Sequence, residues 1–68
     1  MVDIKHKFGE KMRQIRKQKK ISQEELAFRA GLHRTYISDV ERGFRNISIE
    51  NIEKLAKALN VNIDKLIS

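Results

Sequence analysis

The middle of the chain carries side chains that are suited to recognising nucleic-acid bases by hydrogen bonding. Long or hydroxylic polar residues gather there, and they are Arg34, Thr35, Tyr36, Ser38 and Asp39. Arginine has a planar fork that matches the O6 and N7 acceptors of guanine, and hydroxyl groups can bond to several base edges. If this segment is a helix, Ile37 and Val40 anchor its inner side. The polar side chains are then left on the outside.

The same sequence lacks the residue patterns of enzymes and metal sites. It has no cysteine, so it has no thiol nucleophile, no thiolate zinc site and no disulfide. His6 and His33 are the only imidazoles, and no helical spacing links them. It shows no pairing of carboxylates in a plausible pocket, no His-Glu metal spacing and no glycine-rich phosphate loop. We therefore expect no enzymatic activity, no metal, no cofactor and no small-molecule ligand.

Charge favours a polyanionic partner such as DNA. The 68 residues include 15 Lys and Arg against 9 Asp and Glu, for a formal net charge of +6. Residues 1–34 hold ten basic and four acidic side chains, whereas residues 35–68 hold five of each. No apolar run approaches the roughly 20 residues of a membrane span, and no secretory signal follows Met1. We expect a cytoplasmic protein without a membrane partner.

Apolar residues at helical spacing predict five helices, no strands and a single domain over residues 1–68. The first helix is expected at 4–19 with Asp3 as its N-cap, and its apolar face consists of Ile4, Phe8, Met12 and Ile15. A later stripe predicts a helix that Ser48 caps and Asn60 ends, followed by a short turn at 62–67. The absence of proline and the presence of only three glycines fit a compact all-α bundle.

Two short helices joined by a tight turn are predicted between Gln23 and Arg42. Ser22 and Glu25 form an S-x-x-E capping box, in which the serine accepts from the amide three residues on and the glutamate reaches back. Gly31 can take the left-handed conformation that ends a helix. Such a pair is a helix-turn-helix unit, whose second helix lies in the DNA major groove.

Several strings in this order resemble the Cro and phage-repressor type of helix-turn-helix regulator, the XRE family. They are Ser22-Gln23-Glu24-Glu25-Leu26-Ala27, Gly31-Leu32, Tyr36-Ile37-Ser38-Asp39-Val40-Glu41-Arg42-Gly43 and Leu55-Ala56-Lys57-Ala58-Leu59-Asn60-Val61. Residues 34–38, 41–42 and 45–46 look most like the controller proteins of restriction-modification systems. The resemblance implies a lambda-repressor-like DNA-binding domain and a homodimeric transcriptional regulator that binds a palindromic operator and controls its own gene.

The resemblance also implies roles for individual residues. Base reading falls to Arg34, Thr35, Tyr36 and Ser38, and phosphate contacts fall to Gln23, His33, Arg42, Arg45 and Asn46. An internal ion pair is implied between Arg16 and Glu41. Two subunits are expected to pair through the apolar residues Val61, Ile63, Leu66 and Ile67. Asp39 is a further base-reading candidate, for cytosine, although a solvated or arginine-paired carboxylate fits it better because carboxylates repel phosphate.

Some roles stay open at the level of sequence. Thr35 and Ser38 either read bases or only decorate the helix surface. Tyr36 either packs partly against the fourth helix or contacts a phosphate or a thymine methyl group. Phe44 packs on the fourth helix, joins the dimer contact or lies over sugar and phosphate. Lys20 stands where the family often has a glycine that ends the first helix.

The function class also has alternatives. A phage-type repressor, an antitoxin-like regulator or a module that bridges proteins would use the same fold. An extension that binds a toxin would mark the antitoxin class, and none is recognised here. RNA polymerase is a candidate further partner of an activator.

Overall fold

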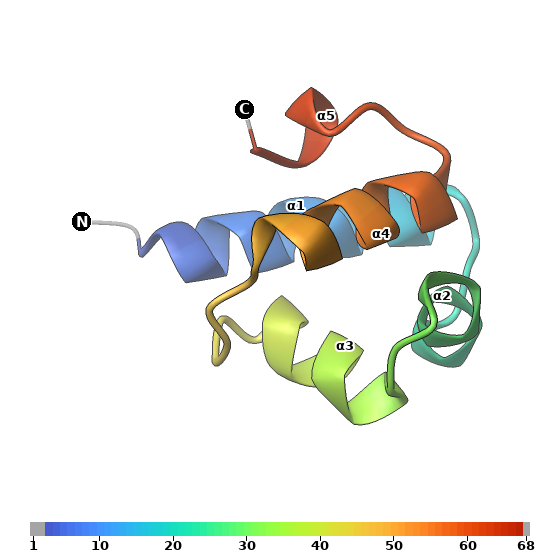
Figure 1. The fold of residues 1–68 in the computed structure, drawn as a ribbon, viewed down its shortest axis with the longest axis horizontal. Coiled ribbons are helices and arrows are strands. Elements are labelled where there is room, and N and C mark those ends of the chain that lie inside the picture. Colours follow the sequence, from blue (N-terminus) through green and yellow to red (C-terminus); the bar gives the residue numbers. More distant parts are fainter. Residues whose placement is uncertain (1–2, 68) are drawn as a thin grey trace.

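The chain folds into five helices in the order that the apolar spacing predicts. A computed structural model describes residues 3–67. Its helices are α1 (Ile4–Gln18), α2 (Gln23–Ala30), α3 (Arg34–Glu41), α4 (Ile49–Leu59) and α5 (Asp64–Ile67), and no strand occurs in this range (Figure 1). Helix α1 packs against α3 and α5, and α2 packs against α3 and α4. The all-α prediction is confirmed. No helix among these residues is long and apolar enough to cross a membrane.

Side-chain caps begin three of the helices where the sequence predicts. Each cap accepts a hydrogen bond from a backbone N–H of the first turn, and the caps are Asp3, Ser22 and Ser48. The return bond predicted for the capping box is wrong. The Glu25 carboxylate instead accepts from Arg29 Nε at 2.8 Å, because that arginine lies one turn along on the same helix face. Helix α1 ends at Gln18, one residue earlier than expected.

Left-handed residues terminate the helices and turn the chain. Gly31 (φ +70°) ends α2 and Asn60 (φ +58°) ends α4, both as predicted. Lys20, just after α1, also has a positive φ of +58°. This conformation costs a residue with a Cβ about 1–2 kcal/mol, whereas glycine adopts it freely. The turn into α2 is therefore strained at Lys20.

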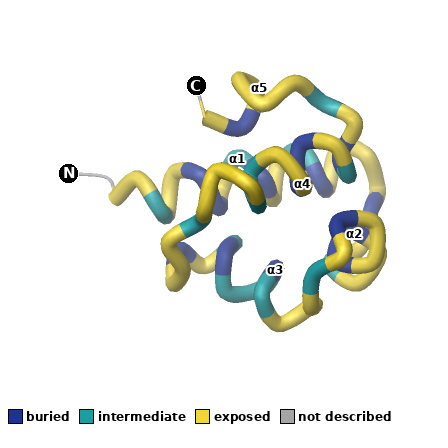
Figure 2. The backbone as a smooth tube through the Cα atoms, in the orientation of Figure 1, coloured by how far each residue is buried: buried dark blue, intermediate teal, exposed yellow. Residues whose placement is uncertain are grey.

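One apolar core holds the helices together, and Figure 2 shows its buried positions on their inner sides. Its most deeply buried side chains are Met12, Leu26, Ile37, Val40, Leu55, Leu59 and Leu66. Leu66 was expected at a subunit interface, and this expectation needs correction. Only 2 % of Leu66 is exposed within the single chain, because α5 packs against α1. Its side chain belongs to the core of the single chain.

A close approach at Gly9 fixes how α3 sits on α1. A Cβ atom on Gly9 would lie 2.3 Å from the carbonyl oxygen of Val40 and 2.9 Å from that of Glu41. No real side chain tolerates such distances to backbone, so only glycine lets the two helices come this near. The contact lies at the end of α3. It therefore positions the one helix that carries the predicted base-reading residues.

Candidate nucleic-acid interface

The helix-turn-helix unit is tied to α1 by an almost buried ion pair between Arg16 and Glu41. The arginine donates from Nε to Oε2 at 2.6 Å and from Nη2 to Oε1 at 3.1 Å, and the two side chains are only 10 % and 4 % exposed. Arg16 Nη1 also donates to the carbonyl of Ile21 at 2.8 Å. Gln23 Nε2 donates to Glu41 Oε1 at 3.0 Å. The end of α1, the start of α2 and the end of α3 thus meet at one carboxylate.

Helix α3 has the inner and outer faces that the sequence predicts. Ile37 and Val40 are buried in the core, whereas Arg34 and Thr35 are exposed in the first turn. His33 occupies the N-cap position with extended backbone but makes no side-chain capping bond. The free N–H groups of this turn are left for another acceptor, and a helix N-terminus favours an anion there. The start of α3 is therefore polar, exposed and suited to DNA.

Tyr36 follows the packing alternative that the sequence left open. It is half-buried against the core, and its hydroxyl accepts a hydrogen bond from Asn51 Nδ2 at 3.0 Å. Asn51 lies in the first turn of α4, so this bond couples α3 to α4. Because the phenol accepts from Asn51, its own hydrogen is left to donate outward. Apolar spacing carries no signal for Asn51, which is why the sequence missed this partner.

Asp39 is paired with two arginines. Its Oδ1 accepts from Arg42 Nη2 at 2.9 Å, and its Oδ2 accepts from Arg45 Nε at 3.4 Å. The hydrogen bond from Arg42, followed by that from Arg45, lowers the pKa of the Asp39 carboxyl below its ordinary value of 3.8. The carboxylate is therefore ionised at neutral pH. The structure favours the arginine-paired interpretation of Asp39 over cytosine recognition.

Both of these arginines also lie over aromatic rings. The guanidinium carbon of Arg42 is 5.0 Å from the centroid of the Phe44 ring, and that of Arg45 is 5.3 Å from the centroid of the Tyr36 ring. Such distances allow cation–π attraction. Phe44 itself is 66 % exposed. Its role was open in the sequence, and here its ring supports an arginine at the edge of α3.

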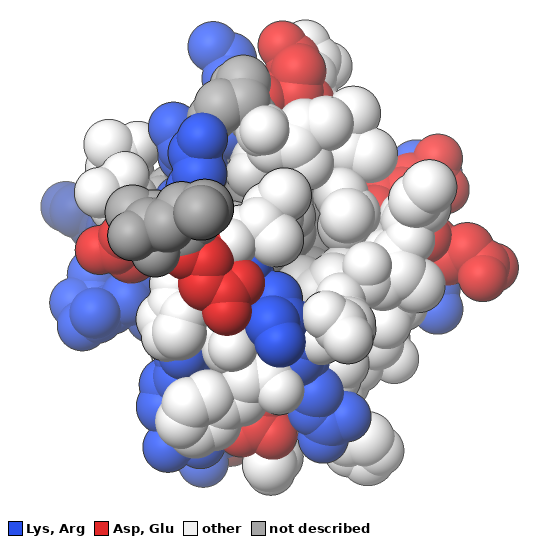
Figure 3. Space-filling model, turned by 90° about the vertical axis from the view of Figure 1, so that its left-hand side faces the viewer, with Lys and Arg blue, Asp and Glu red and all other residues white. Residues whose placement is uncertain are grey.

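The residues expected to contact phosphate surround α3. Four of them, His33, Arg42, Arg45 and Asn46, are exposed. Gln23 is half-buried, and one of its amide hydrogens is used by Glu41. Ser22, Gln23 and Arg34 contribute to an open depression where the first turns of α2 and α3 come together. In Figure 3, basic side chains gather over the lower part of the molecule, at the height where Figure 1 places α3 and the loop after it.

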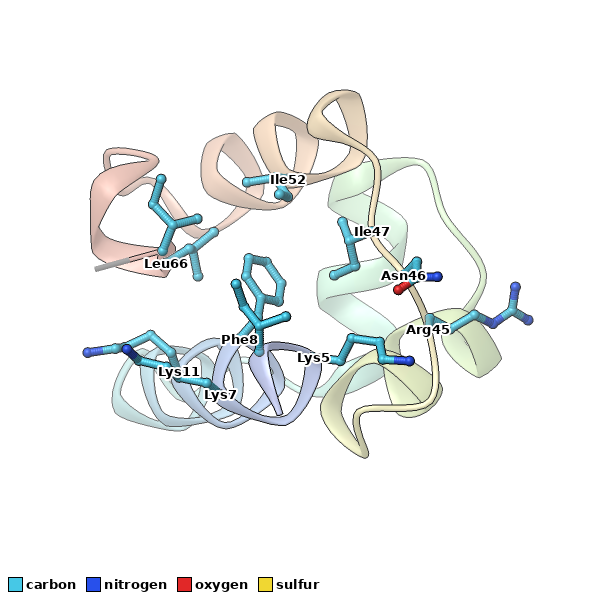
Figure 4. A pocket seen from close by; sticks show the side chains of 11 residues that line it. Lys5, Lys7, Phe8, Lys11, Arg45, Asn46, Ile47, Ile52 and Leu66 are labelled. Atoms are coloured by element: carbon cyan, nitrogen blue, oxygen red, sulfur yellow. The ribbon is translucent and has the colours of Figure 1, made fainter. Parts of the chain in front are cut away.

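The residues expected at a dimer contact lie on another side of the molecule, around α5. Val61 is half-buried, and Ile63 and Ile67 are exposed. A pocket of about 230 Å³ opens beside Ile67, and its apolar lining consists of Ile4, Phe8, Ile47, Ile52, Leu66 and Ile67. Figure 4 shows Phe8, Ile47, Ile52 and Leu66 converging, while the guanidinium of Arg45 points away from the pocket. The sequence missed Ile4 and Ile47 as parts of this surface.

The fold agrees with comparisons to known proteins. A family model described as helix-turn-helix matches residues 12–66. The control protein C.BamHI of Bacillus amyloliquefaciens is 62 % identical over 60 residues, which cover 87 % of this chain and 74 % of that protein.

Two solved structures extend the comparison. The restriction-modification controller protein C.AhdI of Aeromonas hydrophila has a TM-score of 0.90 at 50 % identity, covering 91 % of this chain and 94 % of its own. C.Esp1396I bound to a 25 base pair operator site has a TM-score of 0.84 at 37 % identity, covering 91 % and 82 %. The chain therefore belongs to the helix-turn-helix family of DNA-binding transcription regulators, in the group of restriction-modification control proteins.

Proposed function

We propose that this chain is a single-domain regulator that binds a palindromic operator as a homodimer and controls genes of a restriction-modification system, its own included. One observation carries the proposal: the first turn of α3 presents Arg34 and Thr35 to solvent while Ile37 and Val40 lock its other side into the core. A helix held in this way presents polar groups on a rigid element. The major groove, about 12 Å wide, admits one such helix.

Base reading and phosphate binding divide between the start and the flanks of α3. Arg34 has the geometry for a bidentate contact with guanine, and Thr35 and Ser38 supply hydroxyls beside it. Tyr36 is held by Asn51 and reaches phosphate or a thymine methyl with its outer edge. The flanking phosphates are met by Gln23, His33, Arg42, Arg45 and Asn46. Phosphate contacts of this kind set register and orientation on the duplex.

Pairing of two chains is assigned to the apolar surface around α5. Val61, Ile63 and Ile67 supply this surface. Ile67 also lines the pocket beside α5, together with Ile4. In Figure 1, α5 and α3 lie at opposite sides of the molecule, so a contact at α5 leaves α3 uncovered. A small domain buries little surface by itself, and pairing adds to its stability. Two reading helices roughly 34 Å apart then match half-sites about 10 base pairs apart.

Protein concentration sets the response in this proposal, through dimerisation and cooperative binding. The protein acts where its operator lies, in the cytoplasm, and RNA polymerase is a partner if the bound dimer activates transcription. The test is fluorescence anisotropy with the duplex upstream of its own gene and with a random duplex of equal length, while light scattering reports the oligomeric state. We expect about 1,000-fold preference or more for the upstream duplex, with occupancy that follows dimer concentration. Equal affinities, or full occupancy by a monomer, would reject the proposal.

A further inference from the structure

The two arginines after α3 are each held at two points. Arg42 is bonded to Asp39 Oδ1 at 2.9 Å and lies over the Phe44 ring, and Arg45 is bonded to Asp39 Oδ2 at 3.4 Å and lies over the Tyr36 ring. One carboxylate thus uses both oxygens to restrain both guanidinium groups. A long side chain fixed at the carboxylate and at a ring keeps few of its rotamers. This arrangement restrains both cations at the edge of α3.

The backbone between these arginines is fixed by the same residue. The N–H of Phe44 donates to the carbonyl oxygen of Asp39 at 2.9 Å, and Gly43 turns the chain there with a φ of +77°. The backbone of Asp39 therefore holds the start of the loop, and its side chain holds the two guanidinium groups. Its own side chain is only 19 % exposed. The cluster of Asp39, Arg42, Phe44, Arg45 and Tyr36 forms one unit at the edge of α3.

A carboxylate at this place weakens the electrostatic attraction to DNA, because it cancels positive charge beside the phosphates. The bonded arginines nevertheless keep donors that point elsewhere. Arg45 donates to Asp39 through Nε, and its two terminal nitrogens have no acceptor among residues 3–67. Those nitrogens can meet phosphate from one fixed direction. A phosphate contact made from a fixed direction raises the affinity only for a duplex that is docked in the correct register.

From this geometry we infer that Asp39 is a positioning residue that sets the specificity of operator binding. It contacts no base; it holds Arg42 and Arg45 so that they reach phosphates only when α3 is seated correctly in its groove. Mobile arginines would bind any duplex equally well. The inference rests on the proposed function of α3 and adds to it the residue that separates operator from bulk DNA.

The test compares Asp39→Asn with Glu25→Gln. Each substitution removes one negative charge and one arginine-bonded carboxylate, but Glu25 bonds Arg29 within α2 and holds neither Arg42 nor Arg45. The probes are the duplex that the wild-type protein selects from a random pool and a scrambled duplex of the same composition. We expect Asp39→Asn to lower the ratio of the two affinities about threefold to tenfold, with tighter binding of the scrambled duplex. Glu25→Gln is expected to change that ratio less than twofold.

Two further measurements separate positioning from folding. Thermal unfolding of Asp39→Asn shows whether the fold is retained, and nitrogen relaxation of the arginine Nε–H groups reports mobility at Arg42 and Arg45. We expect both groups to be ordered in the wild type and mobile in the variant. In a protein that already carries Arg42→Ala and Arg45→Ala, Asp39→Asn should leave the ratio unchanged, because nothing remains for Asp39 to hold.

The outcomes are distinct. An unchanged ratio in Asp39→Asn, or an equal fall in Glu25→Gln, would overturn the inference and leave the proposed function intact. A fall in the ratio that persists without the two arginines would also overturn it. A wild-type protein that selects no duplex at all would overturn both.

Discussion

Arg16 Nε lies 2.6 Å from Glu41 Oε2, and this contact joins the first helix to the last residue of the helix that is proposed to read DNA. The same arginine holds the carbonyl of Ile21, and the same glutamate holds the amide of Gln23. No buried side-chain nitrogen or oxygen among the described residues lacks a hydrogen-bond partner. The orientation of α3 depends on a polar network as well as on apolar packing.

Removing only one partner of this ion pair should destabilise the fold strongly. Glu41→Ala leaves the Arg16 guanidinium almost buried without its carboxylate, and we expect a loss of about 3–5 kcal/mol in the free energy of unfolding. Urea denaturation followed by circular dichroism measures the loss. The matched control is the double variant Arg16→Met with Glu41→Leu, which removes both charges and should be more stable than Glu41→Ala alone. A loss below about 1 kcal/mol in Glu41→Ala, typical of a surface pair, would contradict this role.

Arg34 is expected to contribute to sequence discrimination directly. Arg34→Ala should weaken binding to the operator by about 1–3 kcal/mol and relax the preference at one base pair of each half-site. Competition gel shifts with singly substituted operators measure both effects. Arg29→Ala serves as the control, since Arg29 is an exposed arginine on α2 that pairs with Glu25. If Arg34→Ala kept full discrimination, α3 would be docked in a different register from the one proposed.

Arg45 should behave as a phosphate contact. Arg45→Ala is expected to weaken binding to every duplex, and more so to the operator, where the guanidinium is seated from a fixed position. The slope of log affinity against log salt should become shallower by about one unit, because one phosphate contact is lost. Titrations at several salt concentrations give the slope. A selective effect at one base pair with an unchanged slope would instead assign Arg45 to a base.

The pairing of Asp39 predicts a pH dependence of stability. Its lowered pKa means that the folded state favours the ionised carboxylate, so its contribution is present above the ordinary value of 3.8 and is lost as pH falls through the lower folded value. Asp39→Asn should therefore be less stable than the wild type at neutral pH, and the difference should shrink as the pH falls below 3.8. Urea midpoints across this range measure it. A difference that persists unchanged at the acid end would mean that Asp39 acts through something other than its charge.

Ile67 should matter for pairing and not for folding. It is 58 % exposed in the single chain, so Ile67→Asp costs little in the monomer but places a charge in the proposed contact. Sedimentation should shift from dimer to monomer while helicity is kept. Phe28→Asp is the control, because Phe28 is an exposed apolar residue on α2, with 77 % of its surface accessible. A dimer that survives Ile67→Asp and dissociates with Phe28→Asp would move the interface to α2.

Local signals predicted the helices well because capping and helix ends depend on neighbouring residues. Asp3, Ser22 and Ser48 cap as expected, and Gly31 and Asn60 end helices in the left-handed conformation. The division of α3 into a buried side and an exposed side was also predictable. It follows from a periodic pattern within a single helix.

Contacts between helices were harder to foresee. The approach of α1 to α3 at Gly9 depends on the distance between two backbones, which no periodic pattern reports. The bond from Asn51 to Tyr36 joins residues on separate helices. Leu66 looked like an interface residue because it lies in an apolar C-terminal segment, yet packing on α1 buries it. The support of Arg42 by Phe44 likewise depends on how the loop turns back.

Two copies of α3, one from each subunit of the proposed dimer, are expected to read a symmetric site. Selection of bound sequences from a random duplex pool tests it most directly, with the wild-type protein at a concentration where it is dimeric. We expect a two-fold symmetric consensus whose half-sites are centred about 10 base pairs apart, with a guanine preference in each half-site that Arg34→Ala removes. An enriched pool without symmetry, or no enrichment at all, would contradict it.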